Sequence, residues 1–218
     1  STDYRHDEWG VDVTVGGAQK GLMLPPGMSF NAVSDKALNA AKSSKLLKSF
    51  WSWDDMLTMN KVGFFPYTPA TQMLQGLAVS IDMLHEEGLD NVFARHARLA
   101  EATRRAVRAW GLETLCRDSK YYSPTITAVL LPDGHDADAF RGLALETFNI
   151  SYGASFGPYA KKYFRIGHLG DINDGWMMGV LAMTEMTLSL ARIPHKKGGV
   201  QAAMDYIASV HAGGARAA

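Results

Sequence analysis

The residue with the clearest chemical potential is Lys20, which lies in the glycine-rich stretch 16–21 (GGAQKG). This stretch directly follows residues 11–15, a weakly alternating apolar segment that predicts a short strand. Glycines let the backbone approach a ligand closely, and burial beside a cofactor would favour the neutral, nucleophilic form of a lysine amine. Taken alone, the spacing also fits a solvated surface lysine, so both roles stay open.

Other well-known chemical motifs are missing from the sequence. None of the seven histidines forms a His-x-x-x-His pair, and His85 is followed by two glutamates without the second histidine of a zinc motif. No Gly-x-Ser-x-Gly nucleophile motif occurs. The stretch 16–21 is not a phosphate-binding P-loop, because Gly21 follows its lysine where Ser or Thr is required. We therefore expect no metal site.

Composition narrows the class of protein. The 218 residues are 47% hydrophobic and 20% charged, which is typical of a globular chain. Lys plus Arg and Asp plus Glu each number 22, and this zero balance argues against a nucleic-acid or anionic-membrane binder. The single cysteine, Cys116, excludes an internal disulfide framework and a cysteine-cluster metal site.

The sequence predicts a soluble, cytoplasmic protein. The most apolar long stretch, residues 176–190, is interrupted by Glu185 and is short for a bilayer span. The first residues carry neither an initiator Met nor an apolar signal region, so we expect no signal peptide and suspect that Ser1 is not the natural start.

Apolar periodicity predicts the elements that must position these side chains. Helices are expected at residues 34–41, 70–86, 89–110, 136–149, 174–192 and 200–211, and strands at residues 11–15, 126–131, 150–155 and 163–166. Strand and helix alternate, which favours an α/β or α+β class. A composition shift near Gly88 marks a candidate domain boundary.

Three segments, in order along the chain, resemble class V pyridoxal-phosphate aminotransferases, and most of all their serine–glyoxylate and alanine–glyoxylate group. The likeness runs from about residue 3 to about residue 212. The segments are residues 7–27, with DEWGVDV, GAQKGL and PPG; residues 64–71 (FFPYTPAT); and residues 164–170 (FRIGHLG).

The resemblance implies a role for four residues. Lys20 would hold pyridoxal phosphate covalently and, once released, carry the Cα proton of the substrate. Gln19 would support the cofactor phosphate, and Thr68 would donate a hydrogen bond to the phosphate of a partner subunit. Arg165 would bind the substrate carboxylate through its planar fork, and a structural ion pair is the alternative for this residue.

The resemblance also implies an architecture. The fold would be the α/β fold-type-I transferase fold, with residues 1–88 as the C-terminal part of the cofactor-binding large domain and residues 89–218 as the small C-terminal domain. A homodimer with shared active sites is expected. Serine is the expected amino donor and glyoxylate the acceptor. The alternatives are alanine as donor, another class V aminotransferase or lyase, and an inactive truncated chain.

The chain departs from the family pattern in several places. Ala18 replaces a frequent Ser, and Phe65 stands where relatives often have Tyr. Gln19 argues against the cysteine desulfurase branch, which has His there. The family's phosphate loop, ring-stacking aromatic residue and ring-pairing Asp lie upstream of its lysine and have no counterpart in this sequence. Asp3, Asp7 and Asp12 are not placed to replace that Asp by the family pattern.

Overall fold

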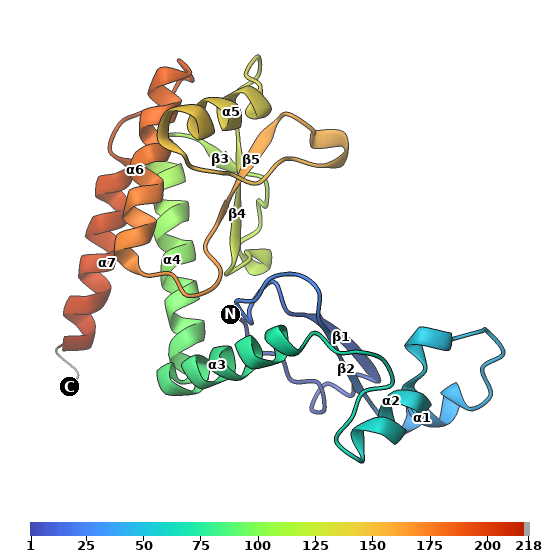
Figure 1. Cartoon of the computed structure of the whole chain (residues 1–218). Coiled ribbons are helices and arrows are strands. Elements are labelled where there is room, and N and C mark those ends of the chain that lie inside the picture. Colours follow the sequence, from blue (N-terminus) through green and yellow to red (C-terminus); the bar gives the residue numbers. More distant parts are fainter. Residues whose placement is uncertain (216–218) are drawn as a thin grey trace. The chain divides into compact units, whose positions relative to one another are not determined.

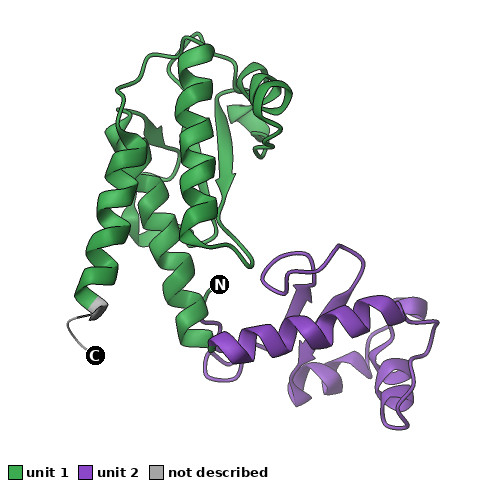
Figure 2. Cartoon of the chain, turned by 60° about the vertical axis from the view of Figure 1, so that its left-hand side comes forward, with its two compact units in different colours: residues 1–2, 88–218 green, residues 3–87 purple. Residues whose placement is uncertain are grey.

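The computed structural model describes residues 1–215, with side chains described as far as residue 213. The chain divides into two compact units, one of residues 3–87 and one of residues 1–2 with 88–218 (Figure 2). Each unit is described by itself. Assigning the two units to a cofactor-binding domain and a small domain stays a prediction.

The unit of residues 3–87 contains one hairpin and three helices. Strands β1 (Val13–Gly17) and β2 (Ser29–Val33) pair antiparallel, with Val13 opposite Val33 and Gly17 opposite Ser29. The helices are α1 (Asp35–Ala41), α2 (Trp53–Asn60) and α3 (Thr71–Glu87). Ser34 is the N-cap of α1, since its hydroxyl accepts a bond from the Ala37 N–H.

The second unit is an antiparallel sheet covered by helices (Figure 1). The strands β3 (Glu113–Thr114), β4 (Ile126–Leu130) and β5 (Tyr163–Gly167) lie in that order. The helices are α4 (Leu89–Ala109), α5 (Ala137–Phe148), α6 (Asp174–Leu190) and α7 (Gly199–Ala215). Asn173 caps α6 by accepting a bond from the Trp176 N–H.

Alternation along β4 and β5 gives the sheet two different faces. Val129, Phe164 and Ile166 point into the core, and Phe164 packs on Phe140 of α5 with ring centroids 4.3 Å apart. The opposite face carries the other set of alternating residues, among them Arg165 of β5. No described helix is long and apolar enough to cross a membrane.

One expected strand does not form. Residues 150–155 make only an isolated bridge, between Gly153 and Arg165. The reason is local, because a glycine followed by Ala154 and Ser155 gives weak strand propensity and the chain turns away after one residue pair. Strand β2 and helix α2 were not predicted.

Candidate active site

Lys20 lies in the loop that joins β1 to β2. The buried Ala18 closes the base of this loop, since its N–H donates to the Met28 carbonyl at 3.1 Å and its carbonyl accepts from the Leu24 N–H at 3.2 Å. A third bond runs from the Met23 N–H to the Lys20 carbonyl at 3.0 Å. The backbone of the loop is therefore fixed, while the Lys20 side chain is exposed.

Helix α3 supports the same loop from one side. The Ser80 hydroxyl donates to the Leu22 carbonyl at 2.5 Å. Gly76 faces Leu24 so closely that a Cβ at residue 76 would lie 3.0 Å from the leucine Cδ2 atom. Small side chains on α3 thus let the loop approach the helix and hold its position.

Gln19 folds back over the end of β1. A Cβ at Gly17 would lie 2.8 Å from the Gln19 side-chain oxygen, so only glycine leaves this amide where it is. The structure therefore places an exposed amide and an exposed amine next to each other on one loop.

Thr68 lies between Pro66 and Pro69, in an irregular, exposed segment before α3. The neighbouring Tyr67 ring packs on Phe50, with centroids 4.9 Å apart. Within the described part of the chain, no hydrogen bond joins Thr68 to Lys20 or Gln19.

Arg165 stands on the sheet face that points away from the core. Ala128 lies directly opposite it on β4, and Gly153 pairs with it on the other side. The guanidinium carbon lies 4.4 Å from the centroid of the Phe156 ring. Arg165 and the exposed loop of Lys20 belong to different units.

The guanidinium of Arg165 has a buried donor without an acceptor. Its Nε atom makes no hydrogen bond to any residue that the structure describes, and no described carboxylate forms an ion pair with it. The structural ion pair that sequence reasoning left open is therefore not found. Buried donors are normally satisfied, so an orphaned one indicates a place for a bound acceptor.

His168 supports the Arg165 segment, a role that sequence reasoning did not assign. Because the Pro124 carbonyl can only accept, Nδ1 donates to it at 2.9 Å, and Nε2 accepts from the Thr127 hydroxyl at 2.9 Å. Burial lowers the pKa of His168 to about 4. The only signal in the sequence was its position inside the FRIGHLG segment.

The loop after β5 is fastened to α4. The Gly170 N–H donates to His96 Nε2 at 3.2 Å, and Arg95 donates to the carbonyls of Gly170 and Ile172 at 2.8 and 2.9 Å. These bonds fix the direction in which the chain leaves Arg165.

Two of the N-terminal aspartates have structural partners. Asp12 accepts bonds from Lys36 at 2.6 Å and Ser34 at 2.8 Å, and the Lys36 ammonium holds the pKa of that carboxyl below its usual value. Asp3 pairs with Arg5. Among the described residues, no group of three or more His, Cys, Asp or Glu side chains could hold a metal ion.

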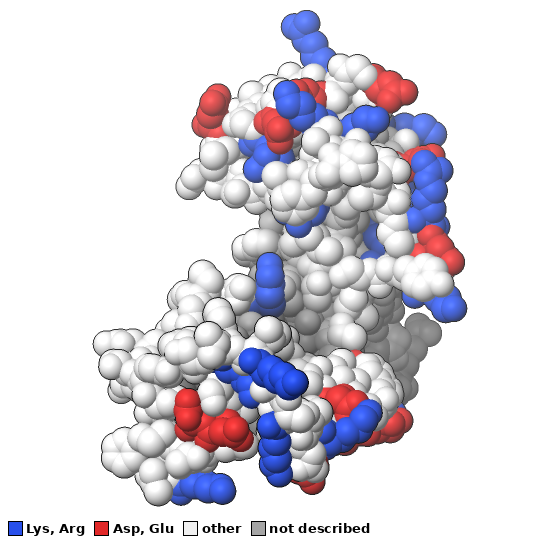
Figure 3. Space-filling view, turned by 90° about the vertical axis from the view of Figure 1, so that its right-hand side faces the viewer, with Lys and Arg blue, Asp and Glu red and all other residues white. Residues whose placement is uncertain are grey.

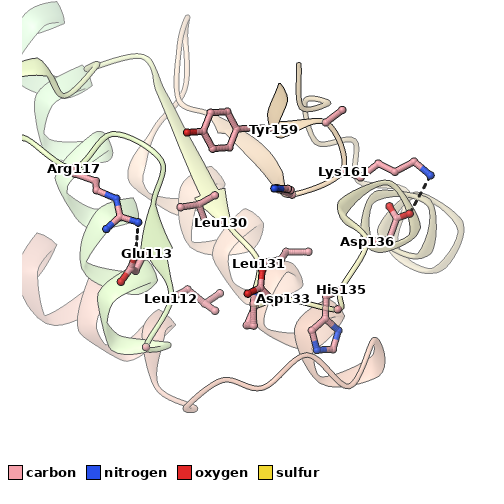
Figure 4. A pocket seen from close by; sticks show the side chains of 15 residues that line it. Leu112, Glu113, Arg117, Leu130, Leu131, Asp133, His135, Asp136, Tyr159 and Lys161 are labelled. Atoms are coloured by element: carbon pink, nitrogen blue, oxygen red, sulfur yellow. Dashed lines mark ion pairs between the residues drawn. The ribbon is translucent and has the colours of Figure 1, made fainter. Parts of the chain in front are cut away.

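A separate cavity of about 800 Å³ lies beside β3 and β4 and was not predicted (Figure 4). Two of its lining cations are already engaged, Arg117 with Glu113 at 3.1 Å and Lys161 with Asp136 at 3.3 Å. On the face drawn in Figure 3, basic and acidic side chains are interspersed. Two of the positive charges that line the cavity are thus paired with carboxylates that also line it.

Comparison with known proteins identifies the relatives of the chain. No family model matches it. It is 48% identical over 209 residues to the serine–glyoxylate aminotransferase of Hyphomicrobium methylovorum, an alignment that covers 94% of this chain and 52% of that protein. It is 41% identical to the L-aspartate–glyoxylate aminotransferase of Paracoccus denitrificans, with the same coverage. The chain spans about half the length of the curated relatives it matches.

A solved structure agrees with these relatives. The pyridoxamine–pyruvate aminotransferase of Mesorhizobium loti matches with a TM-score of 0.89 at 30% identity, over 95% of this chain and 54% of that one. The expected α/β, fold-type-I architecture is confirmed. Over nearly its whole length the chain is thus similar to pyridoxal-phosphate-dependent aminotransferases, as its resemblance to the C-terminal portion of class V members predicted.

Proposed function

We propose that the complete protein carrying this chain transfers the amino group of a small amino acid to glyoxylate, with pyridoxal phosphate as cofactor. Serine is the donor that we favour, giving hydroxypyruvate and glycine. The observation that carries the proposal is Arg165, whose buried Nε donor finds no acceptor among the residues that the structure describes. Both substrates are carboxylates, and a guanidinium binds a carboxylate through two parallel N–H···O bonds.

The loop of Lys20 fits the cofactor. Its amine is exposed and makes no hydrogen bond or ion pair to the described residues, so it is free to form a covalent bond. The exposed Gln19 amide belongs to the same loop and lies over Gly17, and its NH₂ group can donate to a phosphate oxygen. When bound, pyridoxal phosphate supplies an aldehyde that captures the amino group and a ring that delocalises the electron pair left by the Cα proton.

Each residue then has one task. The Lys20 amine would take the proton from the substrate Cα and pass it to the former aldehyde carbon of the cofactor within the same half of the exchange, and it would run the reverse transfer in the other half. Gln19 and Thr68 hold the phosphate. Arg165 fixes the substrate carboxylate, and so the orientation of the Cα–H bond. The loop bonds at Ala18 keep the Lys20 backbone still while its side chain moves.

We further propose a cytoplasmic homodimer in which Thr68 reaches the site of the partner subunit. The large apolar side chains exposed close to Thr68 in sequence support this, since a monomer rarely exposes so many together. They are Leu46, Leu47, Phe50, Trp51, Val62, Phe64, Phe65 and Tyr67. Residues 1–88 would belong to the cofactor-binding domain and residues 89–218 to the small domain.

The test is the rate of hydroxypyruvate formation from serine and glyoxylate by the complete protein. We expect Lys20→Ala to lower this rate by a factor of at least about a hundred, because the proton carrier is removed. Lys45→Ala is the matched control, since Lys45 is another exposed lysine of the same unit, and it should leave the rate unchanged. An unchanged rate in Lys20→Ala would refute the proposal.

The donor is decided by a comparison at fixed glyoxylate. Alanine and aspartate are the competing donors, the latter because the Paracoccus relative is named for it. A higher kcat/KM with alanine or aspartate than with serine would change the proposed amino donor but not the proposed family. A complete protein that neither binds the cofactor nor transaminates would favour an inactive member.

A further inference from the structure

Arg165 is surrounded by residues that leave room beside it. Ala128 faces it across β4, and the paired Gly153 has no side chain at all. The backbones of Gly153 and Arg165 exchange two hydrogen bonds, at 2.9 and 3.0 Å, so Ala128 occupies the closer, non-hydrogen-bonded position on the other side. The residues paired with Arg165 on both sides are therefore small.

Gly153 lies so close to the Arg165 side chain that a larger residue does not fit at this position. A Cβ at residue 153 would lie 2.9 Å from Arg165 Nε, 3.1 Å from its Cβ and 3.2 Å from its Cζ. Real Cβ atoms almost never lie under 3.0 Å from another heavy atom, and the backbone fixes the Cβ of Arg165, so a larger residue would push the arginine side chain aside.

Phe156 reaches Arg165 from the loop that follows Gly153. The Phe156 N–H donates to the Tyr163 hydroxyl at 3.0 Å, and the Lys161 N–H donates to the Ser155 hydroxyl at 2.6 Å. The ring then lies 4.4 Å from the guanidinium carbon, although 63% of the residue is exposed. Core packing does not account for an aromatic ring held in this way, whereas a ring face attracts a cation.

We propose, on the basis of the function proposed above, that Gly153 and Phe156 are positioning residues for substrate binding. The glycine leaves space for the guanidinium, and the ring of Phe156 covers it, so that the N–H edge of Arg165 stays directed at the substrate carboxylate. Neither residue touches the reacting atoms. Both act through Arg165, on the binding of every carboxylate that the site accepts.

The test uses the complete, cofactor-loaded protein and two different substitutions of Phe156. Phe156→Leu keeps an apolar side chain but removes the aromatic face, and Phe156→Tyr keeps the face. We expect Phe156→Leu to raise the KM of serine and of glyoxylate about threefold to tenfold with kcat nearly unchanged, because the lost interaction is common to ground and transition states. Phe156→Tyr should keep both KM values near those of the wild type.

Glycolate, a two-carbon carboxylate without an exchangeable amino or oxo group, gives a readout that does not depend on turnover. Its Kd, measured by calorimetry, should rise in Phe156→Leu by the same factor as the KM values. Tyr121→Leu is the matched control, because Tyr121 is an exposed ring beside the surface cation Lys120 of the same unit, and it should change nothing. Gly153→Ala should weaken glycolate binding more than tenfold, while Gly142→Ala, which meets open space, should not.

The outcomes separate this inference from the proposed function. Wild-type KM and Kd values in Phe156→Leu would overturn the role of the ring, even in an active enzyme. A wild type that binds glycolate through Phe156 but does not transaminate would refute the proposed function and leave the positioning role standing. A wild type that does not bind glycolate would overturn the positioning role.

Discussion

His168 is a buried, neutral imidazole that directly follows β5, the strand that carries Arg165. Its two hydrogen bonds, to the Pro124 carbonyl and from the Thr127 hydroxyl, use both ring nitrogens in one tautomer. A proton on Nε2 would break the bond from Thr127 and place a charge in the interior. The fold therefore depends on His168 remaining neutral.

This gives a prediction for the effect of pH on stability. The pKa of His168 is about 4 when folded and near its ordinary value of 6.5 when unfolded, so between these values only the unfolded chain binds the proton. Acidification from pH 7 to 4 should therefore reduce the free energy of unfolding by about 3 kcal/mol from this residue, with no further loss below pH 4.

Urea unfolding of the wild type and of His168→Gln at pH 7 and pH 5 checks this. The variant should be less stable at pH 7 but lose less stability on going to pH 5 than the wild type does. His85→Gln, at an exposed position of α3, should keep the wild-type difference between the two pH values. If His168→Gln lost as much stability between pH 7 and pH 5 as the wild type does, burial of this imidazole would not make stability depend on pH.

At the scale of elements, Glu185 joins three helices of one unit. Glu185 belongs to α6, and its carboxylate accepts a hydrogen bond from the Trp110 indole, at the end of α4, at 2.7 Å. It also accepts bonds from the N–H groups of Gly198 at 3.0 Å and Val200 at 3.3 Å, at the start of α7. Burial alone would raise the pKa of Glu185, but these bonds outweigh it and hold the pKa below its ordinary value. A carboxylate also complements the positive N-terminal end of a helix.

We expect Glu185→Ala to lower the free energy of unfolding by about 2–4 kcal/mol, since a charged acceptor is lost and donors at two helix ends are left unpaired. Urea denaturation at pH 7 measures this. Glu146→Ala removes an exposed glutamate of α5 and should change stability by less than about 0.5 kcal/mol. Similar values for the two variants would contradict the role given to Glu185.

Long periodic elements could be predicted from the sequence, and some of the short ones could not. The apolar period located α3, α4 and α6 to within two residues. Strand β2 has no clear alternation in SFNAV, and only its pairing with β1 reveals it as a strand. Such elements depend on their neighbours, which a single sequence does not reveal.

The residues of the candidate site, too, could be predicted from the sequence only in part. Motif segments identified Lys20, Gln19, Thr68 and Arg165, although their roles stay proposals. Phe156 could not have been found, because its contact with Arg165 requires the bridge at Gly153 and the bond to the Tyr163 hydroxyl. Sequence spacing predicted a strand where that bridge lies, and so gave no reason to expect a loop over the guanidinium.

At the scale of the whole molecule, the proposed dimer makes a prediction about mixed subunits. If Thr68 completes the site of the partner, a hybrid of Lys20→Ala and Thr68→Ala subunits has one site with both residues intact. Mixing the two weakly active variants under exchange conditions should therefore restore activity, up to about half that of the wild type per hybrid dimer. Each variant mixed with itself is the control. No recovery despite confirmed exchange would place Thr68 and Lys20 in the same subunit's site, or Thr68 outside it.

The most direct measurement of the central claim is to locate the cofactor on the protein. The complete protein, loaded with pyridoxal phosphate, is reduced with borohydride, digested and searched by mass spectrometry for the lysine that carries the pyridoxyl group. We predict that this lysine is Lys20 and that Lys20→Ala carries no such group at a specific site. Attachment to another lysine, or a wild type with no specific attachment, would contradict the account.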